Sequence, residues 1–453
     1  MTLSPSTGVR GVARSEGACG TVCLDGVRLL GAEPTDVLVR DGVIAAVGAR
    51  SESVGARQVD ATGLVMLPAF VDLHTHLREP GAEEAETIAS GTRAAAEGGY
   101  SDVFAMANCA PITDTPRRLT HIAAVAARTA ACRVHPVGAI TRGLAGRELA
   151  PLAEMAAAGA RMFSDDGRCV TDAAVMRAAL AEARRTGTVV AQHAQCDRLA
   201  DAGQINAGPA AERTRLPPWP GVAEESIVAR DAVLAGETGA ALHVCHVSTA
   251  GTVEVVRWAK QRGLPVTAEV APHHLVLDDS LAATGDTLYK VNPPLRGAGD
   301  VAALRAALAD GTIDAVATDH APHPAHRKAA EWCDAPFGML GLETALAIVA
   351  EVLTACGAEC GSEPDWALIA DLMAHTPARI GGVAAVAGRS LRPGEPATFT
   401  LVDPAADWTV DPADSHSLSR NSPYAERKFR CRPITTVVSG TVTSDRAGLL
   451  TPR

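Results

Sequence analysis

The sequence contains no long apolar run. Its longest apolar stretches, such as residues 63–73, stop short of the roughly 20 residues that a membrane-spanning helix needs, and charges or prolines interrupt them. Residues 1–16 carry two arginines but lack the apolar core of a secretory signal. We therefore expect a flexible extension over residues 1–18, no membrane segment and a cytoplasmic location.

An excess of positive charge is also missing. Lys and Arg number 41 against 52 Asp and Glu, which gives a net charge of −11 and argues against nucleic acid as a partner. Gly and Pro together make up 69 of 453 residues, below the level of a low-complexity chain, and 47% of the residues are hydrophobic. This composition predicts a folded chain with one large and one smaller domain.

Paired cysteines of the CxxC type are absent. The 11 cysteines are scattered and odd in number, which favours buried reduced thiols over disulfides. Cys19/Cys23 and Cys356/Cys360 have a spacing that suits a metal, but neither pair has a second pair or a histidine nearby. We do not expect a cysteine metal site.

From Leu64 onward, short β-rich apolar runs alternate with alanine-rich stretches of helical period, most of which end in glycine. The eight expected strands cover residues 66–74, 101–108, 132–140, 160–165, 188–193, 241–247, 265–270 and 314–320. Eight strand-then-helix units over roughly 300 residues are typical of an α/β protein with a (β/α)₈ TIM barrel. A doubly wound sheet is the alternative.

Both flanks of this region read as short strands that cannot bury a core alone. We expect one small β-sandwich-like domain built from both chain termini, with the barrel inserted between its two parts. The expected division is an extension over 1–18, the first part of the small domain over 19–66, the barrel over 67–382 and the second part over 383–453.

Histidines and aspartates gather at the ends of the expected strands. His74 and His76 end the first strand and, being two apart, project to the same side of an extended chain. The fourth, fifth, sixth and eighth strands end in Asp166, His193, His246 and Asp319. Because reactive groups of a barrel lie at the C-terminal ends of its strands, these side chains are expected to converge.

Imidazoles and carboxylates without thiolates suit Zn²⁺ in a hydrolytic site. Five or more ligands exceed what one tetrahedral zinc with an open position can use, so we expect two metals, roughly 3.5 to 4 Å apart, bridged by a carboxylate and a hydroxide. Asp319 is the candidate that moves a proton to the leaving nitrogen, and a purely structural ligand is the alternative.

Several segments together resemble the bacterial class I dihydroorotases of the amidohydrolase superfamily, from about Asp25 to the C-terminus. They are HTHLREPG, FSDDG, HVCHVS, EVAPHHL, NPPLR, TDHAPH and APFGMLGLET. The resemblance implies a zinc enzyme that catalyses the reversible ring closure of N-carbamoyl-L-aspartate to dihydroorotate in pyrimidine biosynthesis. Its partner would be this small molecule.

The resemblance also implies roles for the metal ligands, with two Zn²⁺ per subunit. His74 and His76 would bind the first zinc, Asp166 would bridge, His193 and His246 would bind the second, and Asp319 would be the acid/base against the first. In the family's Asp-Asp-Gly motif the second Asp is the ligand, which favours Asp166 over Asp165. A carboxylated lysine bridge, used by many relatives, has no candidate because residues 100–192 contain no lysine.

The substrate's α-carboxylate requires a cationic receptor, and the planar guanidinium of Arg78 fits it. The resemblance adds further substrate contacts from His76, Asn108, Asn292, His323, Phe337 and Gly338. The competing interpretations are a surface salt bridge for Arg78, turn chemistry for the two asparagines and a core role for Phe337. His273 and His274 exceed the needed ligand set and are interpreted as structural or as supports of the ligands.

Two departures from the family pattern stand out. Met106-Ala107-Asn108 replaces the usual Met-Pro-Asn, and Ala194-Gln195-Cys196-Asp197 replaces an acidic pair beside His193. Neither removes a ligand. The proline-rich segment 320–331 is expected to be a mobile lid that closes over the substrate, so that substrate protects Lys328 from trypsin.

Two other functions remain open. A related cyclic amidohydrolase, such as an allantoinase or hydantoinase, would act on a neutral ring, which has no use for Arg78. A non-catalytic scaffold for aspartate transcarbamoylase would be free to lose His74, His76 or Asp319, and all three are present. At the family level we expect a homodimer, and the resemblance raises an association with aspartate transcarbamoylase.

Overall fold

The computed structural model describes residues 19–48, 55–357 and 363–451, and the fold is α/β. The expected extension over 1–18 and the side chains of the Cys356/Cys360 pair lie outside the described residues. Within those residues, no helix combines the length and apolar character that a membrane span requires.

All eight expected strands of the central region are present and pair in parallel. They are β6 (Phe70–Thr75), β7 (Tyr100–Ala105), β8 (Arg133–Pro136), β9 (Met162–Phe163), β10 (Val189–Gln192), β13 (Leu242–Val244), β14 (Val266–Val270) and β15 (Ala315–Val316). They form sheets in the orders β6-β7-β8 and β15-β14-β13-β10-β9. Isolated parallel bridges, Gly138 to Phe163 and Thr75 to His320, link the sheets, so the pairing order returns to its first strand.

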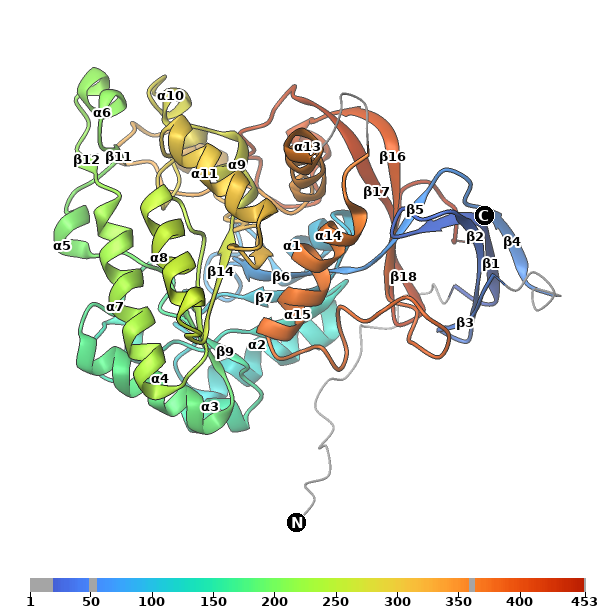
Figure 1. The fold of residues 1–453 in the computed structure, drawn as a ribbon, viewed down its shortest axis with the longest axis horizontal. Coiled ribbons are helices and arrows are strands. Elements are labelled where there is room, and N and C mark those ends of the chain that lie inside the picture. Colours follow the sequence, from blue (N-terminus) through green and yellow to red (C-terminus); the bar gives the residue numbers. More distant parts are fainter. Residues whose placement is uncertain (1–18, 49–54, 358–362, 452–453) are drawn as a thin grey trace, which may run out of the picture.

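A helix follows each of these strands, as the alanine-rich stretches predict. These helices are α1 (Ile88–Glu97), α2 (Pro116–Thr129), α3 (Leu152–Ala157), α4 (Ala173–Thr186), α7 (Val222–Thr238), α8 (Ala250–Gln261), α11 (Ala298–Ala309) and α13 (Ala345–Gly357). Thr87 and Asp172 cap the first turns of α1 and α4, and Gly187 ends α4 in a left-handed conformation. In Figure 1, α4, α7 and α8 line one flank of the parallel strands.

Eight further strands form one sheet from both chain ends, which we call the chain-end sheet. It contains β1 (Val22–Leu29), β2 (Pro34–Arg40), β3 (Val43–Val47), β4 (Arg57–Asp60), β5 (Val65–Pro68), β16 (Phe399–Thr409), β17 (Lys428–Val438) and β18 (Thr441–Asp445). The antiparallel pairing of β5 with β16 joins its two halves. Figure 1 shows them as blue and red arrows beside the helices.

The expected first strand over 66–74 is wrong as a single element. The strand is interrupted at the buried Ala69. β5, which ends just before this residue, belongs to the chain-end sheet, and β6, which begins just after it, belongs to the parallel set. The apolar run is continuous because both strands are buried, so hydrophobicity alone does not reveal that the pairing partner changes.

Shorter elements lie in the connections. They are α5 (Asp197–Ala200), β11 (Ile205–Asn206), α6 (Pro209–Thr214), β12 (Pro218–Trp219), α9 (Pro272–Val276), α10 (Asp279–Ala282), α12 (Ala325–Lys328), α14 (Trp366–Ala370) and α15 (Thr376–Ile380), with a π-helical turn over Asp371–His375 and 3₁₀ turns over Arg142–Leu144, Thr287–Tyr289 and Pro412–Asp414. Within the long connection between β10 and α7, β11 pairs in parallel with β12.

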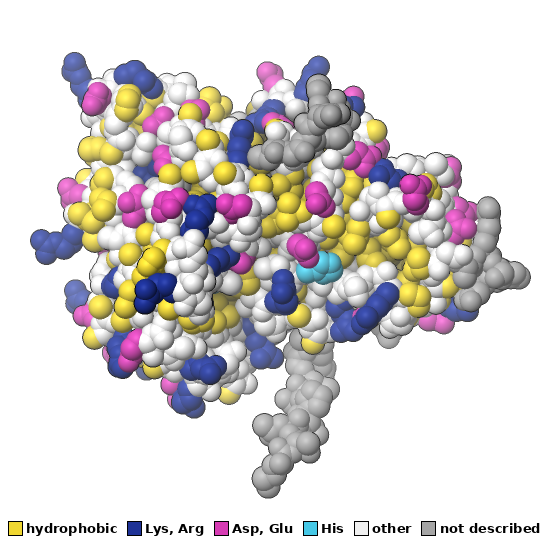
Figure 2. Space-filling model, in the orientation of Figure 1, with side chains coloured by type: hydrophobic (Ala, Val, Ile, Leu, Met, Phe, Trp, Pro, Cys, Tyr) yellow, Lys and Arg dark blue, Asp and Glu magenta, His cyan; other side chains and the backbone are white. Residues whose placement is uncertain are grey.

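The surface and the thiols agree with the composition. Figure 2 shows Lys and Arg side chains intermixed with Asp and Glu on the face it draws, rather than separated by sign. No disulfide joins the nine cysteines with described side chains, and most of them are buried. The expectation of reduced thiols is confirmed for this part of the chain.

Candidate active site

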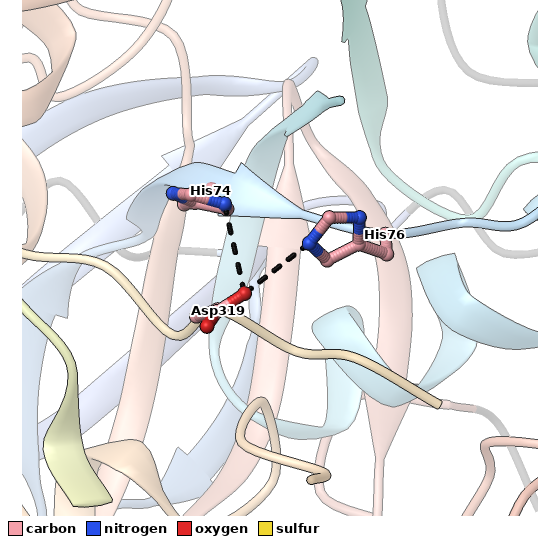
Figure 3. Close-up of side chains that lie close together, drawn as sticks. All are labelled: His74, His76 and Asp319. Atoms are coloured by element: carbon pink, nitrogen blue, oxygen red, sulfur yellow. Dashed lines mark hydrogen bonds and ion pairs between the residues drawn. The ribbon is translucent and has the colours of Figure 1, made fainter. Parts of the chain in front are cut away.

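The first and last strands of the parallel set bring three predicted ligands together. His74 lies on β6, His76 follows the strand, and Asp319 follows β15, whose extension pairs with β6. The Oδ1 atom of Asp319 lies 3.6 Å from His74 Nε2 and 3.2 Å from His76 Nε2. Figure 3 shows both imidazoles directed at this carboxylate.

The strand register that produces this contact depends on Asp72, a buried carboxylate on β6. It accepts hydrogen bonds from the Thr318 backbone N–H at 2.8 Å and the Thr318 hydroxyl at 2.6 Å. The backbone N–H of His76 also donates to the His320 carbonyl at 2.9 Å. These bonds hold the residues on either side of Asp319 against the end of β6.

Asp166 lies at the centre of the predicted ligands. Its Oδ1 is 3.2 Å from His74 Nε2, 3.4 Å from His193 Nδ1 and 3.8 Å from His246 Nε2, and its Oδ2 is 3.4 Å from His76 Nε2. All of these side chains are buried. The structure therefore brings all six predicted metal residues together, and we call them the six-residue cluster.

Asp165, the other aspartate of the pair, accepts hydrogen bonds from the connection after β8 with both carboxylate oxygens. Its Oδ1 accepts the backbone N–H groups of Ile140 at 2.7 Å and Thr141 at 2.9 Å, and its Oδ2 accepts the Thr141 hydroxyl. Asp165 fixes the connection after β8 and leaves Asp166 to face the histidines.

Glu269 on β14 fixes the orientation of His74. Its Oε1 lies 3.0 Å from His74 Nδ1, and its Oε2 lies 2.9 Å from Nε2 of the buried His243. His74 Nε2 then faces Asp166 and is a buried nitrogen without a hydrogen-bond partner among the described residues. A carboxylate behind a metal-binding imidazole is the usual way to direct its second nitrogen at a metal.

Sequence reasoning missed Glu269 and His243. A signal was available, because Glu269 is the one charged residue in the buried strand β14. A lone carboxylate in such a strand needs a buried partner.

A second orienting contact acts on His76. Its Nδ1 lies 3.0 Å from Asn108 Oδ1, and the Asn108 amide donates to Asp166 Oδ2 at 3.0 Å. Asn108, predicted as a substrate contact, thus also joins two members of the six-residue cluster. The replacement of the usual proline by Ala107 does not prevent this arrangement.

Gln195 orients the imidazole of His193 in the same way. Its Oε1 lies 2.9 Å from His193 Nε2 and accepts the Asn292 amide at 3.0 Å. An amide oxygen only accepts hydrogen bonds, so His193 carries its proton on Nε2 and presents Nδ1 toward Asp166. Gln195 therefore links a predicted metal ligand to a predicted substrate contact, a role that the sequence analysis did not assign.

The electrostatics of the six-residue cluster favour ionised carboxylates. Burial alone would raise the pKa of Asp166 and of Asp319, but the nearby histidines, His74 above all, hold both pKa values below their ordinary range. Burial would lower the pKa of His74, and the two carboxylates raise it well above its usual value. Burial and the charge of Arg78 lower the pKa of His76.

The donor atoms fit divalent metal ions. Two three-residue sets, His74-His76-Asp319 and His74-Asp166-His246, each offer ligand atoms within 4.8 Å of one another. Imidazole with carboxylate suits ions such as Zn²⁺. A third set contains Cys245, and burial raises the pKa of its thiol to about 12.

Arg78 lies partly buried beside the six-residue cluster. Its Nε donates to the Pro322 carbonyl at 3.2 Å, and one terminal nitrogen lies 3.4 Å from His323 Nε2. Arg78 makes no ion pair with any residue in the described part of the chain, so the predicted alternative of a surface salt bridge is not present. Its guanidinium charge is available to a ligand.

The other predicted substrate residues lie next to Arg78. His323 Nε2 lies 2.8 Å from the Phe337 carbonyl, and the ring of Phe337 packs edge-on against Trp219 at 5.9 Å. Gly338 has φ +136, and a Cβ at this position would lie 2.7 Å from Ala321 Cβ. The backbone at Phe337 and Gly338 therefore packs directly against the segment that follows Asp319.

The lid expected over residues 320–331 stays a prediction, but the Lys328 side chain is buried in this structure. Lys328 ends the short helix α12 and is buried, with Nζ donating to the carbonyls of Lys290, Pro336 and Gly338 at 3.1 to 3.2 Å. Three carbonyls from two separate segments, residue 290 and residues 336–338, accept hydrogen bonds from Nζ and compensate for its burial. These hydrogen bonds hold α12 against Lys290 and against residues 336–338.

His273 and His274 lie outside the six-residue cluster, as expected. Both are buried in α9, and His274 Nε2 lies 3.1 Å from the Pro293 carbonyl. Burial lowers the pKa of His273 to about 4 and that of His274 well below its usual value. Both imidazoles are therefore neutral; His274 packs against the NPPLR segment, and the ring of His273 packs against that of His274.

The chain resembles known proteins along nearly its whole length. A family model described as "Dihydro-orotase-like" matches residues 63–252. The dihydroorotase of Streptomyces coelicolor is 52% identical over 92% of this chain and 97% of its own length. The dihydroorotase of Mycobacterium tuberculosis is 50% identical over 94% of this chain and 98% of its own length.

Solved structures share the fold at lower identity. The L-hydantoinase (dihydropyrimidinase) from Arthrobacter aurescens superposes with a TM-score of 0.83 and 25% identity, over 94% of this chain and 96% of that one. The dihydropyrimidinase from Brevibacillus agri gives a TM-score of 0.78 at 21% identity, over 94% of this chain and 95% of that one. With a buried histidine and aspartate cluster, a free arginine beside it and relatives half identical over nearly their full length, the chain belongs to the dihydroorotase family.

Proposed function

We propose that this protein interconverts N-carbamoyl-L-aspartate and (S)-dihydroorotate, the ring closure that serves pyrimidine biosynthesis. The observation that carries the proposal is Arg78, which lies beside the six-residue cluster and has no ion-pair partner among the residues that the structure describes. The carboxylate that remains on the ring after closure fits this guanidinium.

The resident metals are proposed to be two Zn²⁺ ions. His74, His76 and Asp319 would hold one, His193 and His246 the other, and Asp166 would lie between them. Metal ions bound there supply Lewis-acid polarisation of the substrate carbonyl and activation of water. The orphaned Nε2 of His74 and the two overlapping ligand sets support this assignment.

Asp319 is proposed to move the proton. During ring closure the ureido nitrogen forms a bond to the side-chain carboxyl carbon, and the Asp319 carboxylate accepts the proton that this nitrogen loses. One carboxyl oxygen takes up this proton from Asp319 and a second proton from the solvent and leaves as water. In ring opening the same group returns the proton to the departing nitrogen, and its low pKa keeps it ready to accept in the forward direction.

The remaining residues are proposed to bind and orient the substrate. Arg78 and His323 lie against each other, with the backbone of Phe337 and Gly338 beside them. Asn292 and Asn108 are proposed to contact the substrate next to the metal ligands. Asn292 is hydrogen-bonded to Gln195, and Asn108 to His76. His76 itself is also proposed to contact the substrate.

The closed pairing order of the eight parallel strands supports a (β/α)₈ barrel, with the chain-end sheet as the smaller, β-sandwich-like domain. The domain division at residues 19, 67 and 383, a homodimer, an association with aspartate transcarbamoylase and a cytoplasmic location stay predictions from the sequence. That nucleic acid is not a partner also stays a prediction from the sequence.

Two other functions are less well supported. The hydantoinases share the fold at 25% identity or less, and a neutral ring has no use for the charge of Arg78. An inactive scaffold would have no need of an intact six-residue cluster, which this chain keeps in contact around Asp166.

A comparison of two rings tests the proposal. Purified protein is given dihydroorotate or 5,6-dihydrouracil, which is the same ring without the carboxylate, and ring opening is followed for both. We expect turnover of dihydroorotate alone, and Arg78→Ala should raise its KM at least tenfold. Preferential turnover of dihydrouracil would favour a hydantoinase-like enzyme, and no turnover of either would favour the scaffold.

A further inference from the structure

A segment from the C-terminal part of the chain lies across the candidate active site. Residues 417–421 precede β17, far along the sequence from the ligands on β6. Asn421 in this segment is 2% exposed. Its side chain accepts the His323 backbone N–H at 3.1 Å and donates to the carbonyls of Ala321 at 3.0 Å and Gly338 at 3.2 Å.

The backbone of Asn421 adds a fourth contact, because its carbonyl accepts the Leu340 N–H at 3.2 Å. One buried residue therefore bonds to two segments that carry proposed substrate contacts, 321–323 and 338–340. A side-chain amide matches this task, since it supplies one acceptor and two donors from a single planar group.

The two segments that Asn421 joins also pack tightly against each other. The Ala321 N–H donates to the Met339 carbonyl at 2.9 Å, and His323 Nε2 lies 2.8 Å from the Phe337 carbonyl. At Gly338 a side chain would lie 2.9 Å from the Ala321 carbonyl oxygen. With no free space between the segments, their relative position determines where His323 and the Phe337–Gly338 backbone lie.

The same C-terminal segment also contacts Glu86, the residue before the N-cap of α1. The Leu418 N–H donates to Glu86 Oε1 at 3.1 Å, and the Ser417 hydroxyl donates to Glu86 Oε2. The same carboxylate lies 3.4 Å from Nε2 of His320, the residue after Asp319. Residues 417–421 thus contact residues 321–323 directly and reach His320, the residue after the proposed proton-transfer group, through Glu86.

We propose that Asn421 is a positioning residue for substrate binding. Its amide holds His323 and the Phe337–Gly338 backbone in the arrangement that receives the substrate, and it does so without touching substrate or metal ligands. This inference rests on the proposed function of the site. It assigns a role in the reaction to the part of the chain that otherwise builds the chain-end sheet.

The test compares Asn421→Ala and Asn421→Asp with Ser422→Ala. Asp keeps the size and the acceptor for His323 but loses both donors. Ser422 is the adjacent buried residue, and within the described part of the chain its hydroxyl accepts a hydrogen bond only from the Tyr424 N–H, at 3.3 Å. Steady-state kinetics with N-carbamoyl-L-aspartate are measured for each variant, with metal content and amide hydrogen exchange on the same samples.

We expect KM to rise at least tenfold in both Asn421 variants, while kcat changes less than threefold and metal content stays at the wild-type level. Hydrogen exchange should accelerate at 321–323 and 338–340, and Ser422→Ala should match the wild type. A KM within threefold of the wild type, or a loss of kcat larger than the rise of KM, would overturn the inference.

Two further outcomes are separated by the design. If Asn421→Ala does not fold, the near-isosteric Asn421→Asp decides by the same criteria. If the wild-type protein itself does not turn over N-carbamoyl-L-aspartate, the proposed function has failed, and the inference that rests on it falls with it. An active wild type with unaltered Asn421 variants would reject the inference alone.

Discussion

At the scale of single residues, the candidate site depends on which nitrogen each histidine presents. Glu269 holds Nδ1 of His74, Asn108 holds Nδ1 of His76, and Gln195 holds Nε2 of His193. Each contact leaves the other ring nitrogen facing Asp166. The orienting residues therefore select the donor atoms before any metal binds.

The role of Glu269 can be measured through metal affinity. Its two oxygens hold two imidazoles, His74 and His243, and the amide of Glu269→Gln can accept from only one of them. We expect a metal affinity lower by about 10- to 100-fold. Competition with a chromophoric chelator measures it, and Glu254→Gln, on the exposed side of α8, serves as the control. Equal affinities in the two variants would refute the role.

The ligands themselves could be predicted from the sequence, whereas their orienting partners could not. His74, His76 and Asp319 stand at strand ends in short motifs, so their convergence follows from the order of the strands alone. Glu269 and Gln195 act through the rotation of one side chain against another, and strand order does not determine such rotations. Asn421 was missed because it comes from outside the parallel strands altogether.

At the scale of elements, the strand and helix order was predictable, and the pairing at the junctions was not. The eight strand–helix units follow from hydrophobic periodicity and glycine stops, which act locally. The break at Ala69 depends on β16, more than 300 residues later in the chain, as the pairing partner of β5. The burial of Lys328 likewise depends on carbonyls contributed by Lys290, Pro336 and Gly338.

Lys328 predicts a pH dependence of stability. Burial and the charge of Lys290 lower its pKa to about 7, whereas an unfolded lysine titrates near 10.4. Between these pH values the unfolded chain binds more protons than the folded one, so raising the pH stabilises the fold. The melting temperature of the wild type should therefore increase relative to that of Lys328→Met as the pH rises from 7 to 10.

Thermal melting of both proteins across this pH range measures the difference, in which the titration of all other groups cancels. Lys260→Met is the control, because Lys260 is partly exposed in an ion pair with Asp314. A constant difference between wild type and Lys328→Met would show that Lys328 keeps an ordinary pKa in the folded protein.

At the scale of the whole molecule, Arg133 joins the parallel strands to the rest of the chain. Its guanidinium on β8 forms two hydrogen bonds with Asp102 on β7, at 2.8 and 2.9 Å. It also donates to the Val386 carbonyl at 2.9 Å and to the Ser439 hydroxyl, in the turn between β17 and β18, at 3.2 Å. One buried cation thus ties the chain-end sheet to the strands that carry the site.

Removing this cation should destabilise the whole protein. Arg133→Ala leaves Asp102 buried without its main partner, and we expect a loss of about 3–5 kcal/mol in the free energy of unfolding. The exposed pair between Arg177 and Glu237 is the matched control, and Arg177→Ala should cost less than about 1 kcal/mol. Urea unfolding of the metal-free proteins compares them. Similar losses in both variants would contradict the role of Arg133.

The most direct test of the account combines turnover and metal content on one sample. Dihydroorotate formation from N-carbamoyl-L-aspartate is followed for the wild type before chelation, after chelation and after Zn²⁺ is restored, and for Asp319→Asn. The account predicts two zinc ions per subunit, activity that chelation removes and Zn²⁺ restores, and a rate about 10²- to 10⁴-fold lower in Asp319→Asn. Turnover that survives chelation, or an Asp319→Asn variant as fast as the wild type, would contradict it.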